Sequence, residues 1–222
     1  MKINADFSRR AVVAGDQYQW CASPQQGVER VMLDRLGEEK ARATSIVRYA
    51  PSSHFPRHQH PGGEEILVLS GTFSDEDGHY PAGWYLRNPP GSSHQPFSDQ
   101  GATIFVKLWQ MDAADNCQAR IDTRDPTSWQ QGDGREICAL YSGFGEQVNL
   151  QRLAAGERLF HTPLQGAELL VLEGELVSDA HTFCQGSWIR LPAGEYPEFI
   201  AGPLGVTLYL KIGRLGKTTL GF

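Results

Sequence analysis

Residues 58–71 read HQHPGGEEILVLSG, and the last nine residues of this stretch recur later in the chain. The block GEEILVLSG at 63–71 matches GAELLVLEG at 166–174, an offset of 103 residues (166 − 63 = 103). A second pair of blocks, GWYLRNPPG at 83–91 and GSWIRLPAG at 186–194, has the same offset (186 − 83 = 103). Two ungapped matches at one offset predict a duplicated unit of about 100 residues, which is a normal domain size.

Short runs of β-branched and aromatic residues fill each repeat, with turn residues such as Asp77-Gly78 between them. These runs lie at 44–49, 65–69, 84–86 and 103–109, and their counterparts lie at 148–153, 169–172, 187–191 and 206–212. Only residues 28–39 show a weak helical period, and a strand followed by a loop is the competing interpretation. Many short strands with glycine and proline turns predict an all-β sandwich or closed barrel.

The two repeats divide most naturally between residues 112 and 134, where Asp, Gln, Gly and Pro cluster between apolar segments. We therefore expect one domain at 1–115 and a second at 116–222. The chain has 222 residues, 40% hydrophobic and 21% charged, which is typical of a globular protein with buried cores.

Charge and the N-terminal residues limit the class of protein. The net charge of −6, without clustered lysines and arginines, argues against a nucleic-acid partner. No apolar run is long enough to span a membrane, and residues 1–6 lack the apolar region of a signal peptide. We therefore expect a cytoplasmic protein without membrane contact, in which Cys21, Cys117, Cys138 and Cys184 are free thiols.

Metal-ligating residue types gather in the first repeat. His58 and His60 are two residues apart, so on a strand both imidazoles project from one face. Glu64 has the same parity, and His94 follows from a distant strand. Three imidazoles and a carboxylate suit Zn, Fe, Mn, Co or Ni better than Ca or Mg, which prefer oxygen ligands.

The same residues carry a resemblance to a known family. His58-x-His60-x3-Glu64-x6-Gly71 and Gly83-x5-Pro89-x-Gly91-x2-His94 resemble the two cupin motifs, although Ser53 lies one position from the place of the opening glycine and Ser98 replaces the final asparagine. More narrowly, the segments 60–65, 74–78 and 87–94 resemble the cupin domain of the ChrR-type anti-sigma factors. The resemblance implies two tandem jelly-roll β-barrels, a bicupin, with zinc ligands at His58, His60, Glu64 and His94.

Further side chains are candidates for the surroundings of the metal. His54 could line the same cavity, although an ordinary exposed or packed histidine is the stronger alternative. Glu65 faces away from its neighbour Glu64 on a strand, which favours a salt bridge or support of the ligands over coordination. Tyr85 and Arg87 are the polar groups that we would place near a substrate, with surface positions as the alternative. The sequence identifies no catalytic residue and no site for an organic cofactor.

The second repeat has lost the metal ligands. The offset of 103 places His161, Pro163, Ala167 and Pro197 at the positions of the four ligands, and one imidazole does not hold a transition metal tightly. His181 has no matched partner. We therefore expect one divalent metal per chain, with zinc favoured and iron, manganese or nickel as alternatives.

Two functions follow from the resemblance. A ChrR-like bicupin implies a sensory or regulatory module of a transcriptional stress response, but the His-x3-Cys-x2-Cys motif of a sigma-binding zinc domain does not occur in this sequence. A sigma factor is therefore expected as a partner only indirectly. The alternative is a metal-dependent dioxygenase that acts on a small ketone or diketone. A small-molecule ligand and a homodimer are compatible with both.

Overall fold

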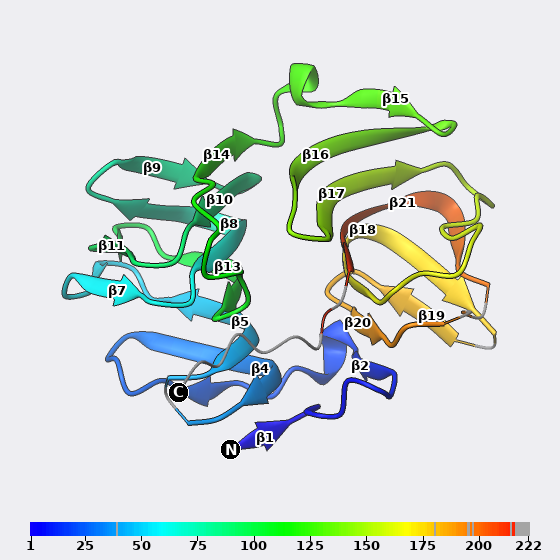
Figure 1. Ribbon diagram of the computed structural model, residues 1–222. Coiled ribbons are helices and arrows are strands. Elements are labelled where there is room, and N and C mark those ends of the chain that lie inside the picture. Colours follow the sequence, from blue (N-terminus) through cyan, green and yellow to red (C-terminus); the bar gives the residue numbers. More distant parts are fainter. Residues whose placement is uncertain (39, 180, 195, 197, 214, 216–222) are drawn as a thin grey trace. The chain divides into compact units, whose positions relative to one another are not determined.

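The computed structural model describes residues 1–38, 40–179, 181–194, 196, 198–213 and 215, and these are almost entirely β-strand and turn (Figure 1). The helical turns in this part of the chain are η1 (Gly15–Gln17) and η2 (Pro126–Ser128), both 3-10. The all-β prediction is thus confirmed. The described residues form two compact units, the first built from Met1–Ala5 and Gln19–Arg124, the second from Asp6–Tyr18 and the described part of Asp125–Gly216.

The main sheet of the first unit has the strand order β1-β4-β5-β13-β8-β10-β14. Its strands are β1 (Lys2–Ile3), β4 (Val28–Leu36), β5 (Arg42–Tyr49), β13 (Ala102–Leu108), β8 (Glu64–Asp75), β10 (Trp84–Asn88) and β14 (Ala119–Asp122). Shorter strands complete the unit: β3 (Cys21–Ala22), β6 (Ser53–His54), β7 (His58–His60), β9 (Gly78–Pro81), β11 (Ser92–His94) and β12 (Phe97–Ser98). β7 and β11 pair with each other as a separate two-stranded sheet.

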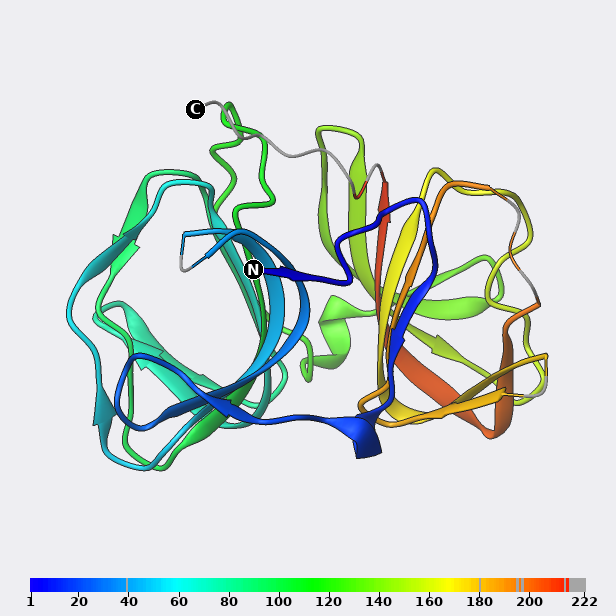
Figure 2. The same ribbon diagram turned by 90° about the horizontal axis from the view of Figure 1, so that it is seen from below.

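The strands of the first unit curve around its interior (Figure 2), which the alternation of side chains fills with apolar groups. Ile66, Val68 and Leu86 are buried there with Ile104 and other residues of the core. The helix alternative for residues 28–39 is wrong, because β4 runs through most of this segment with a register shift between Met32 and Asp34. Such a bulge breaks the strict alternation of a strand and so imitates a helical period.

Two glycines at equivalent positions of the repeats are required by the backbone. Gly71 has φ +68°, and a Cβ there would lie 2.0 Å from the carbonyl oxygen of Gly101. Gly174 has φ +73°, and its Cβ would lie 2.2 Å from the carbonyl oxygen of Gly205. Only glycine fits both the left-handed conformation and the close approach, which explains why these residues close the matching blocks.

The second unit has the sheet order β15-β16-β17-β21-β18-β20-β2, with β19 paired to β18. These strands are β15 (Gln130–Gly132), β16 (Arg135–Gly143), β17 (Glu146–Leu153), β21 (Ile200–Gly213), β18 (Ala167–Ser178), β20 (Trp188–Leu191), β2 (Ala11–Val13) and β19 (His181–Cys184). β18 and β19 begin 103 residues after β8 and β9 (167 − 64 = 103; 181 − 78 = 103). The partners Glu64↔Asn88 recur as Ala167↔Leu191, so the strand register repeats with the sequence.

Two expectations need correction. Neither main sheet returns to its first strand, so continuous hydrogen bonding does not close either one into a barrel among the described residues. The expected division at residue 115 also places residues 6–18 in the first domain. The compact units assign them to the second, because β2 pairs with β20 as an additional edge strand.

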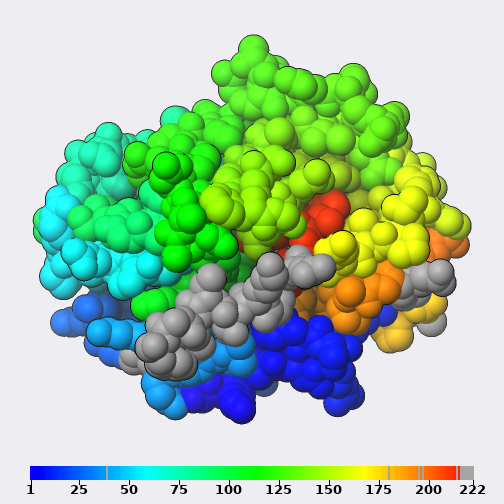
Figure 3. All heavy atoms as spheres, in the orientation of Figure 1, coloured from blue at the N-terminus to red at the C-terminus, as the bar shows by residue number. Residues whose placement is uncertain are grey.

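The prediction of free thiols is confirmed, since Cys21, Cys117, Cys138 and Cys184 form no disulfide. Burial raises the pKa of Cys138 to about 11, which keeps this thiol protonated and unreactive at neutral pH. Among the described residues, no helix has the length and apolar character needed to cross a membrane. Figure 3 colours the atoms by residue number. The cyan and the green segments of the first unit lie next to each other at the surface that it shows.

Candidate metal centre

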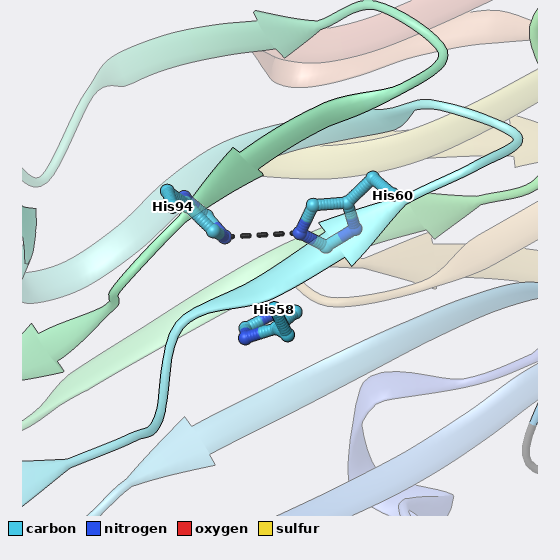
Figure 4. A group of neighbouring side chains, drawn as sticks. All are labelled: His58, His60 and His94. Carbon is cyan, nitrogen blue, oxygen red and sulfur yellow. Dashed lines mark hydrogen bonds between the residues drawn. The ribbon is translucent and has the colours of Figure 1, made fainter.

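The β7–β11 ladder brings three histidines together. His58 and His60 lie on β7 with one residue between them, and His94 lies directly opposite His58 on β11. Figure 4 shows the three imidazole rings converging from these two strands. Their ligand atoms all lie within 4.8 Å of one another, and among the described residues this is the group of three or more His, Cys, Asp or Glu side chains that could hold a metal ion.

The separations between donor atoms suit a transition metal. Nε2 of His60 lies 3.0 Å from Nε2 of His94. Oε2 of Glu64 lies 3.5 Å from each of these two nitrogens. A metal with bonds of roughly 2.0–2.1 Å holds neighbouring ligand atoms about 2.8–3.0 Å apart in octahedral geometry and about 3.3–3.4 Å apart in tetrahedral geometry. The histidine cluster could therefore hold a divalent metal, and Glu64, which is not part of this three-histidine group, lies beside two of its nitrogens.

Neighbouring groups fix which nitrogen two of the histidines present. Nδ1 of His58 lies 3.0 Å from the carbonyl oxygen of Pro56, to which it donates. Nδ1 of His94 lies 3.4 Å from Oδ2 of Asp75 and is held by this carboxylate. A histidine that donates from Nδ1 has its lone pair on Nε2. Both rings thus present Nε2 as a metal-binding atom.

Glu64 is buried and held by Asn88, whose Nδ2 donates to Oε2 of Glu64 over 2.9 Å. Burial acts to raise the pKa of Glu64, but His60, His94 and the bond from Asn88 outweigh it and lower the pKa. Glu64 is therefore a carboxylate at neutral pH, the form that binds a metal.

We expect the substitution Asn88→Leu to lower metal affinity by roughly 10–100-fold, because groups that orient a ligand contribute about this much. Leucine is the residue that the second unit has at the equivalent position, Leu191, so it suits a strand of this sheet. Competition with a chromophoric chelator measures the affinity. The matched control Asn149→Leu, in the second unit, should leave it unchanged, and an equal affinity of Asn88→Leu and wild type would contradict this role of Asn88.

A cavity of about 800 Å³ lies against the cluster, within the first unit. His58, His60 and Glu64 are part of its wall. Most of the remaining wall is apolar and comes from the start of β4, from alternate residues of β5 and β13, and from nearby loops: Val28, Ala43, Val47, Tyr49, Phe55, Ile104, Val106, Leu108 and Trp109. A volume of this size holds a small organic molecule next to the metal ligands.

Tyr49 brings a hydroxyl group to this cavity. Its ring packs edge-to-face on Phe55 and Phe73, with centroids 5.1 and 5.8 Å away. Burial raises the pKa of Tyr49, and the nearby Glu64 carboxylate raises it further. The hydroxyl therefore keeps its proton and is available as a hydrogen-bond donor beside the candidate metal site.

Of the other side chains considered from the sequence, none lines the cavity. His54 is exposed and stacks on Phe97 with centroids 5.7 Å apart. Glu65 and Arg87 are buried and form a salt bridge of 3.3 Å. Tyr85 and Arg87 pair with Leu67 and Glu65 on β8, so they project from the face of the sheet opposite Glu64 and Asn88. Strand parity therefore places Tyr85 and Arg87 on the face of the sheet opposite the one where we expected a substrate.

Asn88 and Asp75 were missed by sequence reasoning, although both lie in segments that carry the family resemblance. Asn88 has the parity of Glu64 on the paired strand, and its equivalent in the second repeat is Leu191. A polar residue that occurs only in the repeat with the histidines is a signal that could have identified Asn88. Asp75 has no such signal, because its equivalent Ser178 is also polar.

The second unit has apolar packing at the positions where the first has Glu64 and Asn88. Ala167 and Leu191 stand at the positions of Glu64 and Asn88, and both are buried in the core. Rings of Phe160, Phe183 and Phe199 meet nearby, with centroids 5.9 and 6.1 Å apart. His161 is exposed beside Arg135, and His181 is exposed and stacks on Phe183. Pro197, the position matched to His94, lies outside the described residues.

Comparisons with known proteins agree with this architecture. The family model of the ChrR Cupin-like domain matches residues 8–112. A suspected dioxygenase from Nostoc punctiforme aligns over 96% of this chain and 85% of its own, with TM-score 0.79 and 14% identity. The Escherichia coli pirin YhhW, solved in complex with nickel(II), aligns over 92% of this chain and 98% of its own, with TM-score 0.65 and 11% identity.

A Cupin 2 conserved barrel domain protein from Leptotrichia buccalis aligns over 95% of this chain and 99% of its own, with TM-score 0.60 and 12% identity. At such low identities these structures show a shared fold. No curated protein sequence matches this chain.

Proposed function

Because the chain belongs to the cupin superfamily and carries a ChrR-type cupin domain, we propose that it is a mononuclear metal enzyme that acts on a small carbonyl compound. The reaction class that fits best is oxidative cleavage of a ketone or diketone by dioxygen. The sequence suggested a regulatory module and, as the alternative, a dioxygenase. We prefer the dioxygenase.

The observation that carries the proposal is the cavity of about 800 Å³ whose wall includes His58, His60 and Glu64. A structural metal is enclosed by its protein ligands, whereas a catalytic metal keeps an open position. Here His58, His60 and Glu64 line the cavity, and His58 is exposed. A small molecule can therefore reach the centre.

A ferrous ion at this site would supply the binding of dioxygen and the polarisation of a carbonyl group. The chain itself supplies the orientation of the ligands and an environment with little water. Asp75 and Pro56 hold the rings of His94 and His58, and Tyr49 offers a proton-bearing hydroxyl to an oxygen atom of the bound compound. Apolar walls strengthen such a hydrogen bond by excluding competing water.

The test is product analysis with labelled oxygen. Iron-loaded protein incubated with a panel of aryl ketones and diketones under ¹⁸O₂ should yield carboxylic acids or aldehydes that contain ¹⁸O in both fragments. Mass spectrometry detects the label. The absence of any cleaved product across the panel would remove the support for a dioxygenase.

A sensory module is the second candidate, and the match to the ChrR Cupin-like family model favours it. In that case the same cavity binds a signal molecule without turnover. Binding of a panel compound to the zinc-loaded protein, together with no cleavage by the iron-loaded protein, would favour this function.

We infer further that the two compact units are two cupin repeats and that the second is degenerate. The repeated register of β8–β10 and β18–β20 supports duplication. The apolar replacements Ala167 and Leu191 support the loss of the metal ligands in the second repeat.

A further inference from the structure

Trp109 has a backbone conformation that is unusual for a large side chain. It follows β13 directly and has φ +58°, in the left-handed region. A bulky residue rarely adopts this conformation, because its Cβ crowds the following carbonyl group, and such strain persists only where the surrounding structure imposes it. The surroundings of Trp109 therefore indicate why the chain has an indole at this position.

The second unit has a glycine at the equivalent position. Glu64 pairs with the residue before Trp109, and its equivalent Ala167 pairs with the residue before Gly213. The amide group of Trp109 donates to the carbonyl oxygen of Gly63 over 3.2 Å, and that of Gly213 donates over 3.1 Å to the glycine 103 residues after Gly63. Gly213 has φ +148°. This point of the fold therefore suits glycine, and the first unit departs from that preference.

Gly62 provides the space for the indole. A Cβ at Gly62 would lie 2.6 Å from Cε3 and 2.8 Å from Cδ2 of Trp109, so a side chain at residue 62 would displace the ring. The second repeat has Gln165 at the position of Gly62 (62 + 103 = 165). The repeat with the histidines thus combines a glycine with a tryptophan, whereas the other repeat combines a glutamine with a glycine. This reciprocal exchange indicates that the fold does not require the indole and that its role belongs to the site.

The indole lies next to the candidate metal ligands. Gly62, which it contacts, belongs to the short segment between His60 and Glu64. Trp109 lines the cavity together with His60 and Glu64 and is half-buried, so the protein leaves part of its surface uncovered. A flat apolar group of a ligand can cover this surface, because aromatic rings pack on one another in offset or edge-to-face arrangements.

We propose that Trp109 is a specificity-determining residue and that the ligand is an aryl ketone or aryl diketone, whose ring packs on the indole while its carbonyl oxygen reaches the metal. This assignment rests on the proposed function and names its substrate class. The carbonyl carbon of an aryl ketone is bonded directly to the ring, so the platform for the ring must lie next to the metal. The contact of Trp109 with Gly62 meets this requirement. An aliphatic ketone gains only the burial of its surface.

The experiment compares two probes that differ in aromaticity. The compounds 1-phenylpropane-1,2-dione and 1-cyclohexylpropane-1,2-dione share the dicarbonyl group and the size of the ring. Isothermal titration of the zinc-loaded protein measures binding without oxygen chemistry. We expect the phenyl compound to bind roughly 2- to 10-fold more tightly, because an aromatic pair contributes about this much beyond the burial of its surface.

Variants locate the origin of the preference. Trp109→Leu should abolish it, because leucine keeps an apolar side chain without an aromatic ring, and Trp109→Phe should retain most of it. Trp20→Leu is the matched control, since Trp20 is also half-buried in the first unit but lies outside this cavity, with Cζ of Arg48 4.2 Å from the centroid of its ring. It should leave the preference unchanged. Elemental analysis before each titration ensures that only zinc-loaded variants are compared.

Equal or tighter binding of the cyclohexyl compound to the wild-type protein, or binding of neither probe, overturns the ligand class without requiring any variant to fold. A preference that is unchanged in Trp109→Leu, or lost in Trp109→Phe, overturns the role of Trp109 as an aromatic platform. The proposed oxygen chemistry is tested separately with the iron-loaded protein, so an aryl preference without cleavage would retain the ligand class and reject the enzyme.

Discussion

The substitution His60→Ala is expected to lower metal affinity by more than about 100-fold, since a lost ligand costs more than a lost supporting group. Nε2 of His60 lies 3.0 Å from Nε2 of His94 and 3.5 Å from Oε2 of Glu64. The substitution therefore removes a nitrogen atom that lies close to the donor atoms of both His94 and Glu64. Competition with a chromophoric chelator gives the affinity.

The same variant should remain folded. Each unit has its own core of buried apolar residues, which does not include the ligands. A protein with cores of this size does not need a metal to fold. Circular dichroism of the variant and of the chelated wild type should show the same strand content as the metal-loaded protein. His161→Ala, at the position matched to His58 in the second repeat, is the control and should bind metal normally.

Exchange of the metal is expected to switch activity on and off. Zinc has no redox chemistry, so zinc-loaded protein should consume no oxygen with a diketone, whereas iron-loaded protein should consume oxygen as the diketone disappears. Anaerobic reconstitution of the same apoprotein with each metal, followed by measurement with an oxygen electrode, tests this. The variant His60→Ala, treated with iron in the same way, serves as the control for iron that is not bound at the site.

Oxygen consumption by the zinc-loaded and the iron-loaded protein also tests which metal the site uses. The expectation of zinc from the sequence rested on the carboxylate Glu64 beside three histidines, and it stays a prediction. Zinc found after overexpression is not decisive, because zinc binds such sites more tightly than ferrous iron. Equal oxygen consumption with zinc and iron would contradict a redox role of the metal, and no consumption with iron would favour the sensory function.

Much of the candidate site could be predicted from the sequence because its signals are local. The spacing of His58 and His60 places both rings on one face of a strand, and the motif that ends at His94 supplies the third imidazole. The repeat offset of 103 also predicted which strands correspond, as β8 and β18 show.

What the sequence did not reveal depends on register between distant strands. Asn88 reaches Glu64 because β10 pairs with β8, and Arg35 lines the cavity because a bulge reverses the parity of β4. Tyr85 and Arg87 were placed near the substrate for their polarity, but parity turns them to the opposite face. The pairing of β2 with β20 in the second unit has no local signal in the sequence, because it depends on the edge of a strand that lies far along the chain.

Metal stoichiometry tests the central claim most directly. Elemental analysis of the untagged protein after saturation with a divalent metal and removal of the excess should give one equivalent per chain. The double variant His58→Ala, His94→Ala should then give none. Two equivalents in the wild type, with one surviving in the double variant, would contradict the account that the first unit holds the metal and the second has lost it.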